Sequence, residues 1–176
     1  AAPTVTADQT PGPDGGTTGD KLVFPACETA LQASFQYANC AVLTAAVYYV
    51  SLYLKGNAGG EQVYLFAQRC DGLAYGGAVL KTLTTSWVRH TITWTADADA
   101  DGWAICLGRD GRDTPAQDTA TAAMTIFAWG GQNELGGFAS SYIPTTTAAV
   151  VRNAETNNIP SAGNVSGTAG SAFAYV

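Results

Sequence analysis

Two segments of this chain alternate apolar and polar residues, and this period of two sets the strongest limit on the fold. Within residues 50–55 the even positions are apolar and the odd positions are polar or amphipathic. Within residues 89–95 an arginine and threonines occupy the odd positions, whereas His90, Ile92 and Trp94 occupy the even ones. Successive side chains of a β-strand point to opposite faces, so the pattern is typical of strands that are buried on one side.

Further strands are predicted along the rest of the chain. They lie near residues 20–25, 30–37, 61–69, 77–84, 103–108 and 122–130. Clusters of Gly, Asp, Asn or Pro separate most of these segments, as tight turns require. No stretch combines a helical period with capping residues. We therefore predict an all-β fold, an antiparallel β-sandwich of about 8–10 strands with a jelly-roll, galactose-binding-like architecture.

Composition and charge exclude several classes of protein. Hydrophobic residues make up 47% of the 176 residues, which is enough for one core, and charged residues only 12%, against about 25% in typical soluble domains. No apolar run approaches the roughly 18 residues of a membrane span, and the N-terminus does not resemble a signal peptide. The net charge is −6 and the basic residues are scattered, which argues against a nucleic-acid partner. The low charge favours contact with a second copy or with a neighbouring module.

The four cysteines do not form a metal or redox motif. They are Cys27, Cys40, Cys70 and Cys106, and none belongs to a C-x-x-C pair. Three disulfide pairings are open to four cysteines. We favour the interpretation that they are small buried hydrophobic residues in strands.

Catalysis is not expected of this chain. A Ser or Cys nucleophile needs a base, and the single histidine, His90, lies on the apolar face of its predicted strand. The acidic residues lie mostly in predicted turns, and none stands out as half of the carboxylate pair that a glycosidase needs. We therefore predict no catalytic residues and no enzymatic activity.

Aromatic residues on the predicted sheet point to sugar recognition. Flat aromatic rings stack on the C–H face of a sugar, while amide, carboxylate or guanidinium groups bond its hydroxyls. The polar face of the strand at 49–55 carries aromatic rings, and neighbouring strands can add polar groups beside them. The candidate carbohydrate-binding residues are Tyr49, Tyr53, Gln68 and Arg89, with Tyr75 and Trp103 at the ends of the groove. The alternative is that these side chains simply pack on the sheet surface.

An acidic loop offers one candidate calcium site. Its carboxylates are Asp97, Asp99 and Asp101, followed by Gly102, which matches the start of the calcium loop D-x-D-x-D-G. The twelfth position of the loop is Gly108 rather than the bidentate glutamate of that motif. A solvated hairpin loop is the favoured interpretation, and calcium is the alternative.

The composition changes near the C-terminal end. Residues 153–176 are rich in Gly, Asn, Ser and Ala, with a late apolar cluster at residues 173–176. Such a composition is typical of a linker. We therefore predict one domain over residues 1–152, followed by a linker and the start of another module over residues 153–176.

Five segments, in this order, carry a resemblance to a known family. They are PDGGTTGDKL at 13–22, YVSLYLKG at 49–56, TSWVRH at 85–90, WGGQNE at 129–134 and SYIPTT at 141–146. Together they resemble a jelly-roll domain of tailed-phage structural and tail-fibre proteins, which is similar in fold to the carbohydrate-binding modules of xylanases and other glycanases. The resemblance runs from about residue 3 to residue 152, and the closing WGGQNE and SYIPTT segments are its most specific part.

The resemblance implies a second candidate calcium site. Related modules often hold a structural calcium ion between the N-terminal turn and the last strand, where Asp14, Asp20 and Glu134 would supply oxygen ligands together with carbonyls of the glycine-rich turn. Alternatively, Asp14 merely completes a Pro-Asp-Gly turn.

Three function classes remain open. The resemblance favours a non-catalytic virion module that binds cell-surface or plant-type polysaccharide. A fibre spacer without a ligand, and an extracellular carbohydrate-binding module of a secreted glycanase, are the alternatives.

Overall fold

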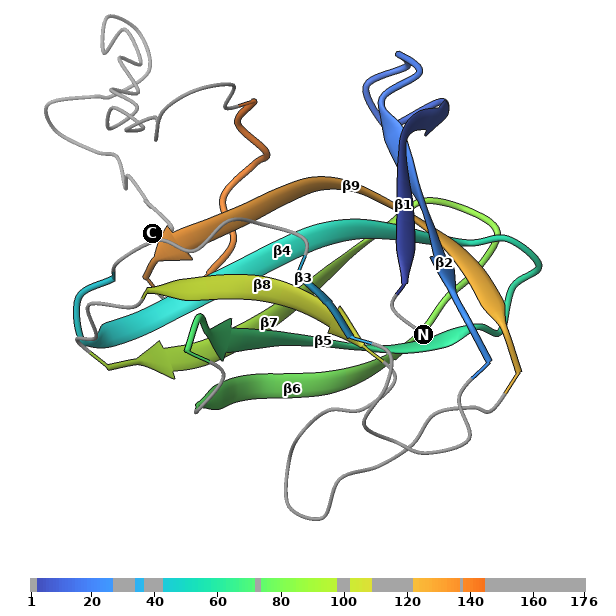
Figure 1. Cartoon of the computed structure of the whole chain (residues 1–176). Helices are drawn as coiled ribbons and strands as arrows, with labels where there is room; N and C mark the ends of the chain where they lie inside the picture. Colours follow the sequence, from blue (N-terminus) through green and yellow to red (C-terminus); the bar gives the residue numbers. More distant parts are fainter. Residues whose placement is uncertain are drawn as a thin grey trace, which may run out of the picture. The chain divides into compact units, whose positions relative to one another are not determined.

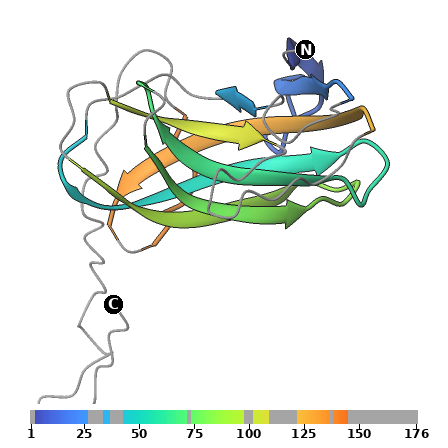
Figure 2. The ribbon, with the colours of Figure 1, turned by 60° about the horizontal axis from the view of Figure 1, so that its bottom comes forward.

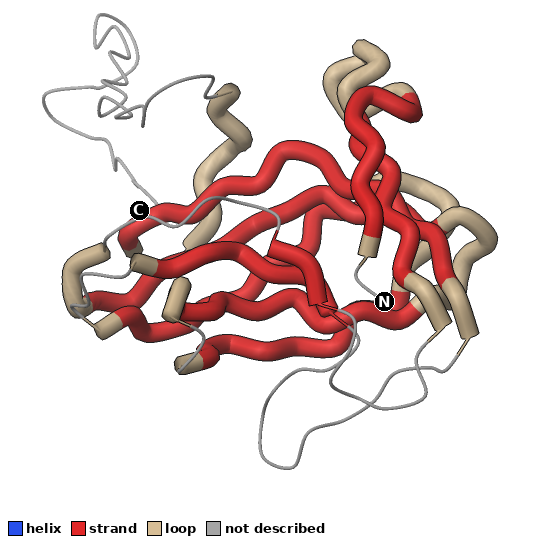
Figure 3. The backbone as a smooth tube through the Cα atoms, in the orientation of Figure 1, coloured by secondary structure: helices blue, strands red, loops and turns tan. Residues whose placement is uncertain are grey.

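The computed structural model describes residues 3–26, 34–36, 43–71, 74–97, 102–108, 122–136 and 138–144. These residues form strands and loops, without a helix (Figure 3). The strands are β1 (Thr4–Thr10), β2 (Gly19–Phe24), β3 (Ser34–Gln36), β4 (Ala46–Gly56), β5 (Gln62–Arg69), β6 (Tyr75–Thr82), β7 (Val88–Ala96), β8 (Trp103–Gly108) and β9 (Met124–Leu135). None of the described segments is a helix long and apolar enough to cross a bilayer.

The strands form two antiparallel sheets that pack face to face (Figures 1 and 2). The five-stranded sheet has the order β1-β2-β9-β4-β7, and the four-stranded sheet has the order β3-β8-β5-β6. Two sheets whose inner faces share one core form a β-sandwich. The all-β sandwich predicted from the alternating pattern is therefore confirmed.

The core lies between the sheets and follows the predicted alternation. Val50, Leu52 and Leu54 of β4 are buried in it, and β7 adds Ile92 and Trp94. The register is fixed accordingly, because Val50 pairs with Ile92 and Tyr48 with Trp94. The odd-numbered residues of β4 and β7 consequently point away from the core.

Two features of the five-stranded sheet differ from the sequence prediction. The strand β1 was not predicted; its residues Thr4 to Gln9 are exposed, so no apolar alternation marks it. The last strand continues past Gly130 to Leu135, although the glycine pair Gly130–Gly131 reads as a turn. Gly130 has φ +62°, and the register of β9 against β4 shifts at this point, as in a β-bulge. The bulge lets the strand continue and carries Gln132 and Glu134 onto the sheet.

The cysteines behave in two ways. Cys106 is a free, buried thiol in β8, as predicted. Cys70 is disulfide-bonded, so the expectation of a buried thiol is wrong there; it follows the end of β5 at an exposed turn rather than in a strand. Cys27 and Cys40 lie outside the described residues, as does the predicted domain boundary at residue 152.

Candidate functional site

The face of the five-stranded sheet that points away from the core gathers several predicted residues. We call it the outer face. It carries Tyr49, Ser51, Tyr53 and Lys55 of β4, Arg89, Thr91, Thr93 and Thr95 of β7, and Phe127, Trp129, Gln132 and Glu134 of β9. Its members follow from the strand register, because Tyr53 pairs with Arg89 and Trp129, and Tyr49 pairs with Thr93 and Glu134. Three predicted sugar-binding residues, Tyr49, Tyr53 and Arg89, therefore share one surface.

A segment that follows β9 covers part of the outer face. We call residues 138–144 the strap. Arg89 holds it, because one guanidinium nitrogen donates to the Ser140 carbonyl oxygen at 2.5 Å and the other to Ser51 Oγ at 2.7 Å. Ser51 is fully buried in consequence. The guanidinium also lies 5.8 Å from the centre of the Tyr53 ring, within cation–π range.

Polar side chains of β9 bind the strap from the other side. The amide of Gln132 donates to Ser140 Oγ at 3.2 Å and accepts from the Ile143 backbone N–H at 3.0 Å. Glu134 accepts hydrogen bonds from the Ser140 backbone N–H, at 3.0 Å, and from the Ser140 hydroxyl. Arg89, Gln132 and Glu134 thus each bind the strap.

The strap ends in an aromatic contact on Trp129. The Tyr142 ring packs against the Trp129 ring at a tilt of 49°, with 4.4 Å between their centres, and Tyr53 makes an edge-type contact with the indole at 5.3 Å. Trp129 is only 9% exposed. Burial raises the pKa of Tyr142, and the negative charge of Asp14 raises it further. An aromatic platform on the outer face is therefore closed by the chain itself.

The hairpin of β1 and β2, whose turn projects beyond the sheet in Figure 1, contacts the adjacent region of the outer face. Trp129 Nε1 donates to Thr18 Oγ1 at 2.9 Å, and Lys55 Nζ donates to Thr10 Oγ1 at 3.2 Å. The Lys55 ammonium also lies 5.0 Å from the centre of the Phe127 ring. The hairpin and the strap together occupy the part of the face around Trp129.

The region around Tyr49 stays open. Tyr49 is partly exposed, its hydroxyl lies 3.5 Å from Thr91 Oγ1, and Thr93 and Thr95 beside it are exposed. Lys81 of β6 donates to the Thr91 carbonyl oxygen at 3.0 Å, so its ammonium reaches this edge of the sheet. Burial lowers the pKa of Lys81, and the interaction with Tyr49 partly offsets that effect. An accessible ring, hydroxyls and an amine thus lie together here.

The other predicted sugar-binding residues lie elsewhere. Gln68 pairs with Tyr75 across β5 and β6, on the opposite sheet. Trp103 is 5% exposed and belongs to the core, where its ring packs on Trp94 with 4.5 Å between centres. The six candidates therefore do not line one groove. The alternating pattern correctly predicts which face of its own strand each of Tyr49, Tyr53 and Arg89 lies on. It does not predict which sheet a strand joins, because that depends on pairing between segments far apart in the sequence.

The three carboxylates that the resemblance assigns to a calcium site each accept hydrogen bonds from different groups of the protein. Asp14 accepts from the Gly16 backbone N–H and the Thr18 hydroxyl, Asp20 accepts from the Asp8 backbone N–H, and Glu134 binds the strap. Burial raises the pKa of Asp20; the Asp8 backbone hydrogen bond opposes this, and the Asp8 charge adds to it. Within the described ranges no three acidic, His or Cys residues group as metal ligands. These three carboxylates therefore do not group by themselves, and a calcium site that adds carbonyl oxygens of the glycine-rich turn stays a prediction.

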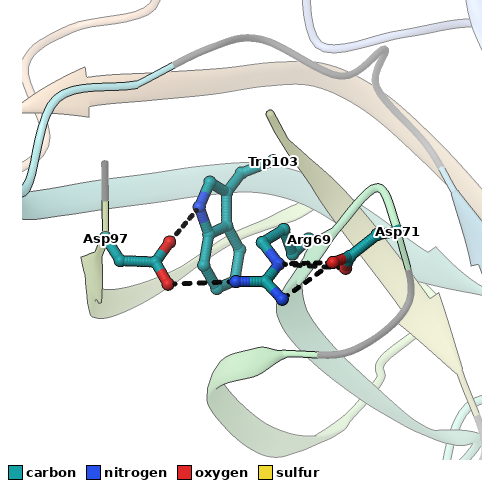
Figure 4. A network of polar contacts seen from close by, with 4 residues as sticks. All are labelled: Arg69, Asp71, Asp97 and Trp103. Atoms are coloured by element: carbon teal, nitrogen blue, oxygen red, sulfur yellow. Dashed lines mark hydrogen bonds and ion pairs between the residues drawn. The ribbon is translucent and has the colours of Figure 1, made fainter. Parts of the chain in front are cut away.

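The acidic loop after β7 begins in an ion-pair network, drawn in Figure 4. Asp97 accepts from Arg69 at 3.2 Å and from Trp103 Nε1 at 3.1 Å, and Arg69 also forms an ion pair with Asp71 at 2.7 Å. A guanidinium that already pairs with the Asp97 carboxylate disfavours a cation there. Asp99 and Asp101 lie outside the described residues.

His90 lies on the inner side of β7, opposite Leu52, as the alternation predicts. Burial lowers the pKa of its imidazole, and the nearby charge of Lys81 lowers it further. Both effects favour the neutral form of the imidazole.

Comparison with known proteins supports the fold. No protein-family model and no curated protein matches the sequence. A solved structure described as "CBM4 structure and function" is 17% identical, with a TM-score of 0.50 over 68% of this chain and 72% of that one. The CBM22-1 xylan-binding domain of Xyn10C from Paenibacillus barcinonensis is 19% identical, with a TM-score of 0.47 over 78% of this chain and 82% of that one. The CBM22-1–GH10 modules of Clostridium thermocellum xylanase 10B with xylohexaose are 14% identical, with a TM-score of 0.42 over 77% of this chain and 25% of that one. The chain has the two-sheet β-sandwich fold of carbohydrate-binding modules.

Proposed function

We propose that this chain is a non-catalytic carbohydrate-binding module and that its ligand lies on the open part of the outer face. The observation that carries the proposal is the partly exposed Tyr49 ring, which lies near threonine hydroxyls and the Lys81 amine at one edge of the five-stranded sheet. An aromatic face with hydrogen-bond donors beside it is the chemistry that sugar rings require.

The ligand that we propose is a cell-surface or plant-type polysaccharide. One structural neighbour is a xylan-binding domain and another was solved with xylohexaose. A chain of β-linked sugars is long enough to run across the threonine row of β7. We expect Tyr49 to stack on one sugar ring and the hydroxyls of Thr91 and Thr93 to bond its neighbours.

The setting that we propose is a phage virion, in a tail fibre or related appendage. The WGGQNE and SYIPTT segments support it, because they are the most specific part of the resemblance to tail-fibre domains. The alternative is an extracellular module of a secreted glycanase, which the xylanase neighbours favour.

A purely structural role in a fibre is the second candidate function. The observation that favours it is the strap, which covers the part of the outer face around Trp129 with the chain's own side chains. A spacer domain needs such packing but no open aromatic residue.

The test is a glycan array probed with the full chain and with two matched variants. Tyr49→Ala removes the open ring, and Tyr75→Ala makes the same change on the opposite sheet. We expect wild type and Tyr75→Ala to bind the same polysaccharides, and Tyr49→Ala to bind about tenfold more weakly, the upper end for one aromatic contact. Unchanged binding by Tyr49→Ala would exclude this face, and silence of wild type across the array would favour the spacer.

A further inference from the structure

We propose that the strap covers a second, latent sugar subsite, formed by Trp129, Arg89, Gln132 and Glu134. A polysaccharide held at Tyr49 occupies it once the strap is displaced. This inference rests on the proposed function and extends the same site across the outer face.

The strap contacts are those that a sugar would make. Trp129 offers an indole ring, against which Tyr142 now packs with 4.4 Å between ring centres and a tilt of 49°. Around it, a guanidinium, an amide and a carboxylate each bind a backbone or hydroxyl group of Ser140. An aromatic platform ringed by these three polar groups is the arrangement that orients a sugar and bonds its hydroxyls. The strap thus occupies the positions of a ligand.

The platform stays in place without the strap. Trp129 Nε1 donates to Thr18 Oγ1 at 2.9 Å, and Tyr53 holds the indole edge. Thr18 is itself fixed by a 2.8 Å hydrogen bond to Asp14. Because these contacts come from the β1–β2 turn and from β4, release of the strap leaves the indole oriented for a ligand.

The strap is attached in a way that permits release. The backbone pairing of β9 with β4 ends where Leu135 pairs with Tyr48. Beyond that point, the described contacts between the strap and the sheet are made by side chains of the sheet. Gly136, just before the strap, has φ +134°, a conformation that favours glycine. Leu135 and Phe138 are 68% and 79% exposed. The strap can therefore swing away without breaking the sheet.

The latent subsite adjoins the open one. Glu134 pairs with Tyr49 across the β4–β9 ladder, and Gln132 pairs with Ser51 one step further along. A polysaccharide chain that stacks on Tyr49 can consequently extend along the face to the strap. Because a covered site binds with an affinity reduced by the fraction of open molecules, loosening the strap raises the apparent affinity.

The test is titration calorimetry of the full chain with xylohexaose, together with tryptophan fluorescence. Tyr142→Ala uncovers the indole, and Tyr142→Phe, which keeps the ring, is the matched control. We expect Tyr142→Ala to bind about tenfold more tightly, because one aromatic pair contributes up to about 1.5 kcal/mol. Its emission shifts to longer wavelength as Trp129 is exposed, while Tyr142→Phe behaves as wild type. Ser140→Gly, which removes the hydroxyl bonded to Gln132 and Glu134, provides an independent opened variant.

The outcomes separate this inference from the proposed function. Adding Trp129→Ala to Tyr142→Ala must abolish the gain, and a gain that persists without the indole overturns the latent subsite. If wild type binds through Tyr49 but both opened variants show exposed tryptophan without tighter binding, the latent subsite is refuted and the proposed function stands. If neither wild type nor the opened variants bind xylohexaose or any glycan on the array, both fail.

Discussion

Replacing Arg89 by glutamine tests how firmly the strap is held to the outer face. The guanidinium donates to the Ser140 carbonyl oxygen and to Ser51 Oγ, and Ser51 has no exposed surface. A glutamine is too short to reach both partners. The substitution therefore releases the strap at one point and leaves a buried hydroxyl without its donor.

The magnitude follows from these two contacts. A hydrogen bond from a charged donor contributes about 1.5–3 kcal/mol, and less where water can replace it. Both bonds are partly buried, so we take the lower end of this range for each and expect a loss of about 3 kcal/mol of unfolding free energy. For a domain of this size that corresponds to a fall of roughly 6–12 °C in Tm.

The assay is urea unfolding followed by tryptophan fluorescence, with calorimetry for Tm. Arg89→Lys keeps the positive charge beside Tyr53 but loses the two-donor fork, and we expect an intermediate loss. Thr93→Ala, on the same face and exposed, is the neutral control and should change stability by less than about 0.5 kcal/mol. If Arg89→Gln matches Thr93→Ala at an unchanged m-value, the strap is not held as the geometry indicates.

Three further predictions follow from single residues. Gly130→Ala introduces a Cβ atom at a residue with φ +62°, and this atom would lie 3.1 Å from the Tyr142 ring. The substitution should lower the unfolding free energy by about 1–2 kcal/mol and shift Trp129 emission to longer wavelength. Unchanged stability and emission would contradict this prediction. The pKa of His90 in the folded chain lies below its usual 6.5, so the unfolded chain takes up the proton first as the pH falls. The unfolding free energy should therefore decrease as the pH drops below 6.5 toward the folded-state pKa, and His90→Gln should remove this part of the pH dependence. An unaltered pH dependence in His90→Gln would assign it to other groups. Burial raises the pKa of Cys106 to about 12, so iodoacetamide at pH 8 should not alkylate this thiol in the native protein. Mass spectrometry should find it alkylated in guanidinium chloride. Rapid labelling of Cys106 in the native protein would contradict its burial.

The alternating pattern predicted most of the fold because it acts locally. Parity along β4 and β7 assigned each side chain to the core or to the outer face, and the structure follows it. The strand β1 carries no apolar alternation because its residues are exposed on both sides. The end of β9 was hidden by Gly130, whose positive φ makes a bulge where a glycine pair reads as a turn.

The candidate site was predictable only in part. Tyr49, Tyr53 and Arg89 come together because adjacent strands in the sheet carry them. Gln68 and Trp103 were grouped with them by residue type, but which sheet takes a strand depends on pairing between distant segments. The strap could not be foreseen for the same reason, since Ser140 meets Arg89 from 51 residues away. The available signal was the WGGQNE and SYIPTT segments, because Trp129 of the first contacts Tyr142 of the second.

The most direct measurement of sugar binding on the outer face is an amide chemical-shift map of the ¹⁵N-labelled full chain during titration with xylohexaose. The largest changes are expected at Tyr49, Thr91 and Thr93, and at Gln132 and Glu134 as the strap is displaced. Changes confined to β5, β6 and β8, or no change at saturating sugar, would contradict binding at this face.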